Sequence, residues 1–181
     1  FFRANKSATT EDILSRLQGV YLIRRGSYGQ EPMLQGMSGG QLNVTIDGMK
    51  MFGACTDKMD PVTIYVEPQN LKGMRIMQGS AGSEMGSTVG GSIDMQLAQP
   101  QLSLRSFYGQ AGVGYQGISN GINSYVNGNY STKHSAYNFG FNYRKAHNYE
   151  DGDGQEVLYS QYEKINFTGG AKWRIGTDTL I

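Results

Sequence analysis

The sequence predicts two kinds of β-rich structure in succession: a small α+β domain, then antiparallel strands of an incomplete transmembrane β-barrel. All nine Met residues lie between Met33 and Met95, whereas Gly, Asn and Tyr dominate the second half. Charged residues make up only 17% of the chain, against about a quarter in soluble proteins. The second half also alternates aromatic with small polar residues, as barrel strands do. We therefore expect one domain over residues 1–98 and another over residues 99–181.

The first domain is expected to open with a short amphipathic helix within residues 9–20. Thr9 or Thr10 can cap its N-terminus, because a threonine hydroxyl there accepts a hydrogen bond from a free backbone N–H. Glu11 and Asp12 follow in the first turn, where negative charge is favourable. Apolar residues then recur on one face, and a glycine ends the helix.

Further segments of the first domain predict strands. Residues 41–47 alternate in polarity and end at Asp47-Gly48, which is a turn signal. A helical turn within residues 66–71 leads into a strand at residues 74–77. A Gly/Ser-rich segment then precedes a last strand at residues 93–97. These elements by themselves indicate only a small α+β domain.

The second domain has a stronger pattern, in which aromatic residues occupy one face of a strand and small polar residues the other. Residues 135–144 place four aromatic side chains on one face, and residues 165–174 and 122–130 repeat the alternation. The aromatic members of the first segment are Tyr137, Phe139, Phe141 and Tyr143. Such dyad repeats have the length and polarity of membrane strands with an apolar outer face.

A soluble antiparallel sandwich would show the same period of two, but it would normally hide Phe and Trp and expose Lys and Glu. The connections also favour the membrane, because a short turn at residues 131–134 alternates with a long acidic loop at residues 147–160. Such connections are typical of periplasmic turns and external loops. Four or five strands cannot close a barrel, so we expect part of a larger protein.

Composition excludes several function classes. The net charge of +1 does not favour nucleic acid. Two His and one Cys provide neither a disulfide framework nor a zinc site. No catalytic constellation is recognisable, and we expect no enzyme activity and no organic cofactor. No apolar run reaches 18 residues, and the chain starts at Phe1 without a start Met, so we expect a mature or truncated product.

The first hundred residues contain three motifs in a familiar order: residues 17–20 (LQGV), residues 44–48 (VTIDG) and the glycine-rich residues 79–91. Together they resemble the plug signature of TonB-dependent receptors. The resemblance implies an α+β plug domain followed by the first strands of a barrel of about 22 strands. It also implies the outer membrane of a Gram-negative bacterium, with the plug inside the barrel facing the periplasm. The implied partners are the inner-membrane TonB complex, outer-membrane lipid and lipopolysaccharide. The TonB box of the family is not recognisable here, and we expect it to precede the chain.

A narrower motif, Cys55 followed by Met59, Asp60 and Pro61, resembles the Cys-x-x-x-Met segment of outer-membrane copper receptors. The resemblance implies that Cys55 and Met59 bind copper, as transported substrate, together with a His and a Met from the barrel wall. Residues four apart lie on one face of a helical turn, so the two sulfur atoms could converge. Soft sulfur ligands select copper(I) over harder ions.

Buried filler is the plainer explanation of an isolated Cys and Met at this spacing, because both types are common in cores. Met49 and Met51 could form a secondary metal relay beside Cys55, although a Met-rich plug core explains them better at this level. Two rival functions remain open. One is TonB-dependent uptake of an iron-siderophore or another nutrient, and the other is a non-transporting surface adhesin that uses a barrel.

Overall fold

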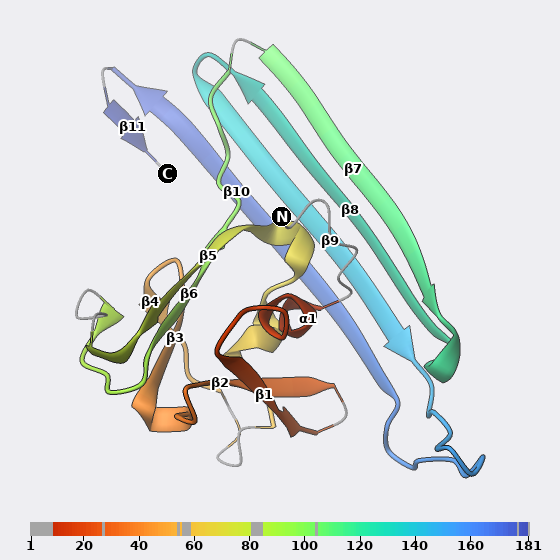
Figure 1. Ribbon diagram of the computed structural model, residues 1–181. Helices are drawn as coiled ribbons and strands as arrows, with labels where there is room; N and C mark the ends of the chain where they lie inside the picture. The colour runs from red at the N-terminus through yellow and green to blue at the C-terminus, as the bar shows by residue number, and fades with distance from the viewer. Residues whose placement is uncertain are drawn as a thin grey trace. The chain divides into compact units, whose positions relative to one another are not determined.

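The chain divides into two compact units, Phe1–Leu97 and Ala98–Ile181, which are described separately (Figure 1). No helix in the described part of the chain is long and apolar enough to cross a membrane. The computed structural model describes residues 9–26, 28–53, 55, 59–80, 85–103, 105–176 and 178–180.

In its described residues, the first unit combines a helix, two small sheets and short 3₁₀ turns. Its helix and strands are α1 Thr10–Leu14, β1 Val20–Arg25, β2 Gly29–Leu34, β3 Leu42–Ile46, β4 Met49–Lys50, β5 Leu71–Gln78 and β6 Gly91–Leu97. Its 3₁₀ turns are η1 Gly39–Gln41, η2 Val62–Tyr65 and η3 Pro68–Asn70. The unit is therefore α+β, as predicted.

The predicted helix forms, and Thr9 caps it. The Thr9 hydroxyl accepts from the Asp12 N–H at 3.0 Å, and the Asp12 carboxylate accepts from the Thr9 N–H at 3.0 Å. This reciprocal capping box satisfies two N–H groups at the helix start. The prediction was wrong about length, because α1 ends at Leu14 and single turns continue to residue 19. Ile13 and Leu14 are both buried, so packing stabilises so short a helix.

The larger sheet has the strand order β4-β3-β6-β5. β3 and β6 are parallel, with Leu42 opposite Gly91 and Ile46 opposite Met95, whereas β4 and β5 join them antiparallel. The predicted strands at residues 41–47, 74–77 and 93–97 are thus confirmed with shifted bounds. The predicted turn after β3 is also confirmed, because Asp47 and Gly48 both have positive φ, 49° and 76°, as a tight hairpin turn requires.

The smaller sheet is the antiparallel pair of β1 and β2, with Val20 opposite Leu34 and Arg25 opposite Gly29. Sequence analysis missed both strands. Their apolar residues do not alternate strictly, and Pro32 lies inside β2. Proline is tolerated there because a two-stranded sheet has only edge strands.

Two apolar clusters form the core of this unit, and both contact the partly buried Val44 and Met74. One contains Ile13, Ile46, Val66, Leu71 and Met95. The other contains Leu14, Val20, Leu34, Leu42 and Ile93. Neighbouring helix residues thus enter different clusters, so α1 ties the two sheets together.

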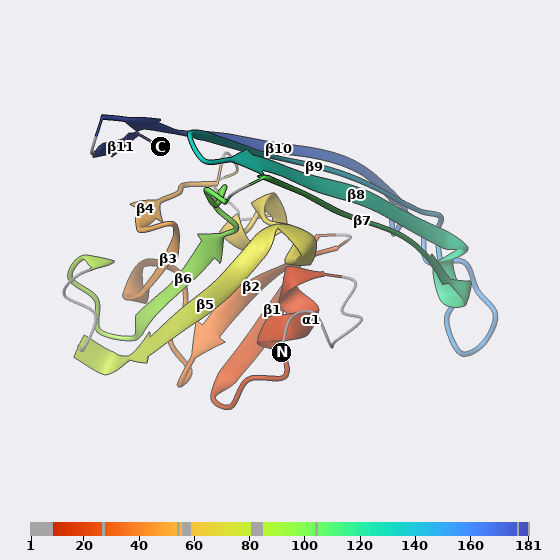
Figure 2. The ribbon, with the colours of Figure 1, turned by 90° about the horizontal axis from the view of Figure 1, so that it is seen from above.

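The second unit contains an antiparallel sheet in the strand order β11-β10-β9-β8-β7, in which β7 to β10 are long and β11 is short (Figure 2). Twelve residues at about 3.3 Å each span about 40 Å, enough to cross a bilayer when the strand is tilted. The strands are β7 Arg105–Gln116, β8 Gly121–Thr132, β9 Ser135–Ala146, β10 Tyr162–Ile175 and β11 Asp178–Leu180, with the 3₁₀ turn η5 Gly117–Ser119 after β7.

The register confirms the predicted alternation in this sheet. Cross-strand partners share a face, and one row joins Ala111, Val126, Phe141 and Phe167 across four strands. Phe141 and Phe167 rings lie 4.9 Å apart. The exposed large apolar residues of this face are Phe107, Val113, Tyr115, Ile122, Val126, Tyr130, Tyr137, Phe139, Ile165, Phe167, Trp173 and Ile175. The apolar face therefore runs across four strands, and most of its large side chains are exposed.

Candidate metal-binding loop

Cys55 and Met59 lie in the loop between β4 and η2. Cys55 is half-buried and Met59 is 57% exposed. Neither residue belongs to the two core clusters formed by the described residues, and neither lies in a helix. Residues 56–58, which would complete the predicted helical turn, lie outside the described residues. The buried-filler explanation is therefore wrong for Met59, whereas Cys55 is only half-buried.

Asp60 holds this loop at two points. The Cys55 backbone N–H donates to Asp60 Oδ1 at 3.1 Å, and the Tyr65 hydroxyl donates to Asp60 Oδ2 at 2.9 Å. The hydrogen bond to Asp60 is the main cause that raises the pKa of Tyr65 above 10.0, and burial and the charge of the carboxylate act in the same direction. Each carboxylate oxygen thus has a defined partner.

The segment after the loop is anchored to the β1–β2 hairpin. The Thr63 hydroxyl donates to the Gln30 carbonyl at 3.1 Å. A Cβ on Gly29 would lie 2.9 Å from Pro61 Cδ and 3.1 Å from the Met59 carbonyl oxygen. This close approach requires a glycine at residue 29. The loop therefore packs against the β1–β2 hairpin, which sequence analysis missed.

Met49 and Met51 lie on the surface, 61% and 39% exposed. The expectation of a Met-rich core was wrong for these two residues. Met49 lies in the short edge strand β4, which leaves its side chain in solvent, and Met51 directly follows this strand. The expectation does hold for Met95, which is fully buried. The amine of Lys50 lies 5.6 Å from the centre of the Phe52 ring, so this edge also carries a cation–π contact.

Chemically, the loop offers a thiol and a thioether outside the core. Among the described residues, no group of three or more His, Cys, Asp or Glu side chains could hold a metal ion. A site for a hard ion such as calcium or magnesium would need several oxygen ligands. The only metal chemistry that these side chains favour is that of a soft ion with few ligands.

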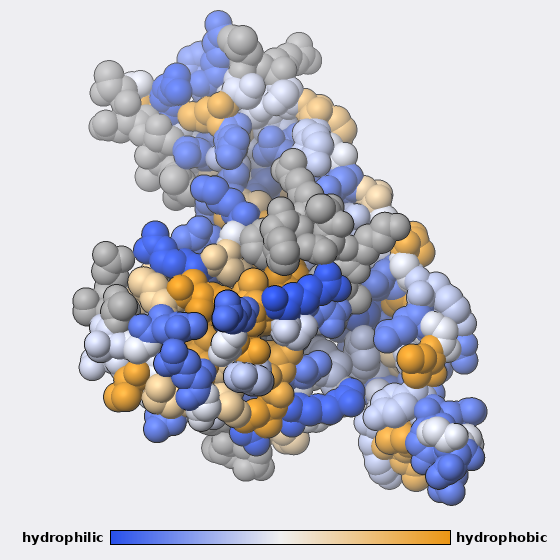
Figure 3. Space-filling model, in the orientation of Figure 1, coloured by the Kyte–Doolittle hydropathy of each residue, from blue (hydrophilic) through white to orange (hydrophobic). Residues whose placement is uncertain are grey.

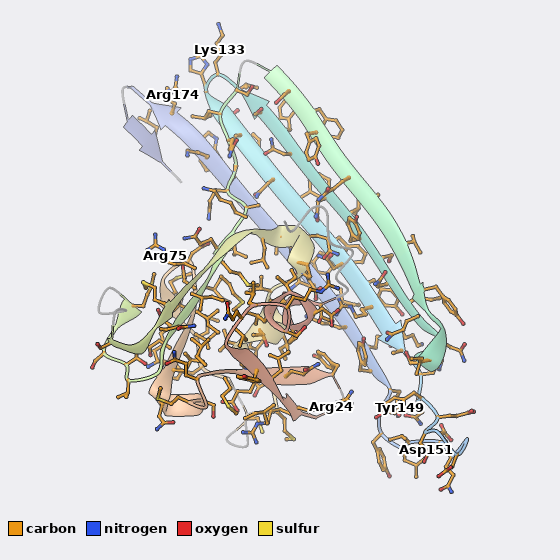
Figure 4. The ribbon with its side chains drawn as sticks, viewed as in Figure 1. Arg24, Arg75, Lys133, Tyr149, Asp151 and Arg174 are labelled. Atoms are coloured by element: carbon orange, nitrogen blue, oxygen red, sulfur yellow. The ribbon has the colours of Figure 1, made fainter. Side chains whose placement is uncertain are left out.

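The two ends of the sheet in the second unit differ in the length of their connections. Lys133 and Arg174 lie at the end with the short turn, whereas Tyr149 and Asp151 belong to the long loop at the opposite end (Figure 4). The Asp151 side chain holds the turn of this loop, because its Oδ1 accepts from the backbone N–H groups of Asp153 and Gln155 at 3.0 and 2.8 Å. In Figure 3 the long loop, at the lower right, carries both hydrophilic and hydrophobic residues. The short and long connections match the predicted alternation.

A sequence profile of the TonB-dependent Receptor Plug Domain matches residues 2–93, about half of the chain. The chain belongs to this family. Comparison with curated protein sequences gives no match. The first unit is thus a TonB-dependent receptor plug, and the second consists of antiparallel strands of the receptor barrel.

Solved structures support the same fold. The copper transporter OprC aligns with 96% of this chain at a TM-score of 0.86 and 23% identity. The FrpB iron transporter from Neisseria meningitidis aligns with 95% of this chain at a TM-score of 0.73 and 17% identity. The ferric enterobactin receptor PfeA from Pseudomonas aeruginosa aligns with 97% of this chain at a TM-score of 0.67 and 15% identity. The chain spans only 27%, 27% and 30% of these proteins, in that order.

Sequence reasoning used Asp60 only as a flanking match and missed its contacts with Cys55 and Tyr65. It also missed Gly53, where a Cβ would lie 2.8 Å from the Asp60 carbonyl oxygen and from Oδ1. No local sequence pattern indicated that Tyr65 is a hydrogen-bond partner of Asp60.

Proposed function

We propose that this chain is part of a TonB-dependent outer-membrane receptor that imports copper. The plug would occupy residues 1–98 and the first barrel strands residues 99–181. The receptor would lie in the outer membrane of a Gram-negative bacterium, with the plug inside the barrel and facing the periplasm. The inner-membrane TonB complex would supply the work of transport, and lipid and lipopolysaccharide would surround the barrel.

The placement of Cys55 and Met59 carries this proposal. A pair that only filled the plug core would be buried among apolar side chains, whereas this pair lies in a surface loop with Met59 largely exposed. A thiolate and a thioether are soft ligands that favour copper(I) over iron(III), calcium or magnesium. The resemblance of the flanking Asp60 and Pro61 to copper receptors adds support.

The remaining copper ligands would come from parts of the receptor beyond this chain. A transported ion must also leave its site, and a site completed by ligands on both the plug and the barrel wall would open when the plug moves. Met49 and Met51 are exposed in the same region of the sequence, so they could receive copper on the way to the periplasm. Uptake of an iron chelate is the main rival, because FrpB and PfeA share the fold.

Metal content of the full-length receptor tests the proposal. The receptor would be purified after growth with copper and compared with its Cys55→Ser and Met59→Ala variants by mass spectrometry of metals. We expect near-stoichiometric copper in the parent and loss in both variants. Met37→Ala is a matched control, because it removes a thioether from the same unit but outside this loop. Absence of copper from the parent, or equal copper in all variants, would overturn the proposal.

Copper uptake by cells separates transport from adhesion. We expect copper accumulation through the receptor to require a functional TonB complex, because the family couples transport to that complex. A surface adhesin would work equally well without TonB. Uptake that is independent of TonB would therefore exclude the importer.

A further inference from the structure

We infer that Asp60 is a positioning residue that holds the Cys55 and Met59 ligands ready for copper. This inference rests on the proposed function, because it concerns the same loop. Asp60 itself would not bind the metal. Its role would be to hold the backbone at Gly53 and Cys55 against Asp60 before copper arrives.

The first argument is that the two oxygens of the Asp60 carboxylate accept hydrogen bonds from different segments. Oδ1 accepts from the Cys55 backbone N–H and Oδ2 from the Tyr65 hydroxyl. The carboxylate therefore connects the main chain at the thiol ligand to the 3₁₀ turn η2 that follows the loop. Hydrogen bonds to a charged acceptor are stronger than neutral ones, so this connection is well suited to restrain a surface loop.

The second argument is the close approach of Gly53. A Cβ at this residue would lie 2.8 Å from both the Asp60 carbonyl oxygen and Oδ1. Real Cβ atoms do not come so close to oxygen, so only glycine lets the two ends of the loop meet in this way. Gly53 and Asp60 are thus in close contact, and Cys55 and Met59 lie between them in the sequence.

The third argument is that the closed loop is also fixed from outside. The Met59 carbonyl oxygen and the Pro61 ring lie against Gly29, and Thr63 bonds to Gln30. The backbone on the Met59 side is thereby attached to the β1–β2 hairpin. Asp60 then holds the backbone on the Cys55 side against this fixed segment.

The expected consequence is a preorganised pair of ligands. A mobile loop would lose conformational freedom on binding copper, and this loss would weaken the affinity. Residues that orient metal ligands through hydrogen bonds typically contribute about 10–100-fold in metal affinity. We expect Asp60 to contribute in this range.

The test uses the full-length receptor and variants of both sides of the contact. Asp60→Ala removes the acceptor, Gly53→Ala forces the two segments apart, and Asp60→Asn keeps a carbonyl oxygen that can accept from the Cys55 N–H. Asp12→Ala is the matched control, because it also removes a carboxylate that accepts from a backbone N–H, in the cap of α1. Copper(I) affinity is measured by competition with a chromophoric copper(I) chelator.

A second measurement needs no copper. The rate at which a maleimide modifies Cys55 in the metal-free receptor, followed on the peptide that contains it, reports how freely this loop moves. We expect faster modification in Asp60→Ala and Gly53→Ala than in the parent, in Asp60→Asn and in Asp12→Ala. We expect the same two variants to bind copper(I) about 10–100-fold more weakly. Asp60→Asn should lie between Asp60→Ala and the parent, because it keeps an acceptor for the Cys55 N–H but loses the charge.

The outcomes separate the two proposals. If the parent binds no copper but the modification rates follow this order, the closed loop stands and copper import fails. If the parent binds copper and Asp60→Ala binds it equally tightly, the positioning role is overturned while import stands. An equal loss in Asp12→Ala, or no rescue by Asp60→Asn, would assign the effect to plug stability and would also overturn the positioning role.

Discussion

The plug and the barrel strands are both rich in β structure, yet they place their large apolar side chains differently. In the plug, Ile93 and Met95 of the central strand β6 are fully buried between β3 and β5. In the second unit, Phe167 is 74% exposed and lies in a row of apolar side chains that crosses four strands. The plug therefore hides its large apolar side chains inside a sheet layer, whereas the second unit exposes them on one face of its sheet.

This difference shows why alternation alone cannot distinguish a soluble sheet from a membrane sheet. Both have a period of two, and the choice depends on which class of residue the exposed face carries. In the second unit the exposed face is aromatic and aliphatic. The indole N–H of Trp173 donates to the Tyr137 hydroxyl at 3.1 Å near the end with the short turn, where membrane proteins place amphipathic rings.

Truncation of the plug core should have the largest effect. Ile93→Ala removes a fully buried side chain, and such changes cost about 2–5 kcal/mol. Phe167→Ala is the matched change in the second unit and should cost little, because no core surrounds this side chain. Hydrogen exchange of β3 and β6 amides in the full-length receptor measures the first effect. Equal losses at both positions would remove the contrast between the units.

A charge on the apolar face tests the membrane assignment directly. Phe167→Lys should destabilise the inserted barrel by about 2–4 kcal/mol if the residue lies near the bilayer centre. Thr168→Lys adds the same charge on the opposite face and should be nearly neutral. The folded fraction in lipid vesicles, followed by heat-modifiable gel mobility, gives both values. A soluble sheet would tolerate Phe167→Lys at least as well as Thr168→Lys.

Polar groups differ between the units as well. Asp94 is buried in the plug and accepts from the Thr45 hydroxyl at 2.7 Å and from the Gly48 N–H at 2.8 Å. Asp94→Ala should cost about 1–3 kcal/mol, because it leaves buried donors without an acceptor. Thr168→Ala on the polar face of β10 should cost much less. Hydrogen exchange at the turn after β3 measures the change, and unaltered protection there would contradict it.

The smallest effect should be the alkaline response of the loop. The pKa of Tyr65 is raised above 10.0 in the folded plug, chiefly by its hydrogen bond to Asp60. The stability from this bond is therefore present below pH 10.0 and is lost as the pH rises through the folded pKa. Tyr65→Phe should remove this dependence. Thermal unfolding of the receptor and its variant across that range compares them, and parallel pH curves would count against the bond.

Local patterns were sufficient for much of this fold. The Thr9 cap, the turn at Asp47 and Gly48 and the alternation of β8, β9 and β10 all depend on side chains within a few residues of each other. The β1–β2 hairpin escaped prediction because its strands lack a clear period. The length of α1 escaped it because burial of Ile13 and Leu14, and not helix propensity, decides where so short a helix ends.

The candidate site shows the same division. From the sequence alone come the soft ligand types at Cys55 and Met59, the membrane-strand period and the family motifs, because each is a property of residue identity and short spacing. Only the tertiary structure decided that Met49, Met51 and Met59 are exposed, that β3 pairs in parallel with β6, and that Asp60 connects Cys55 to Tyr65. Those features depend on which distant segments pack together, and residue spacing along the chain does not specify that packing.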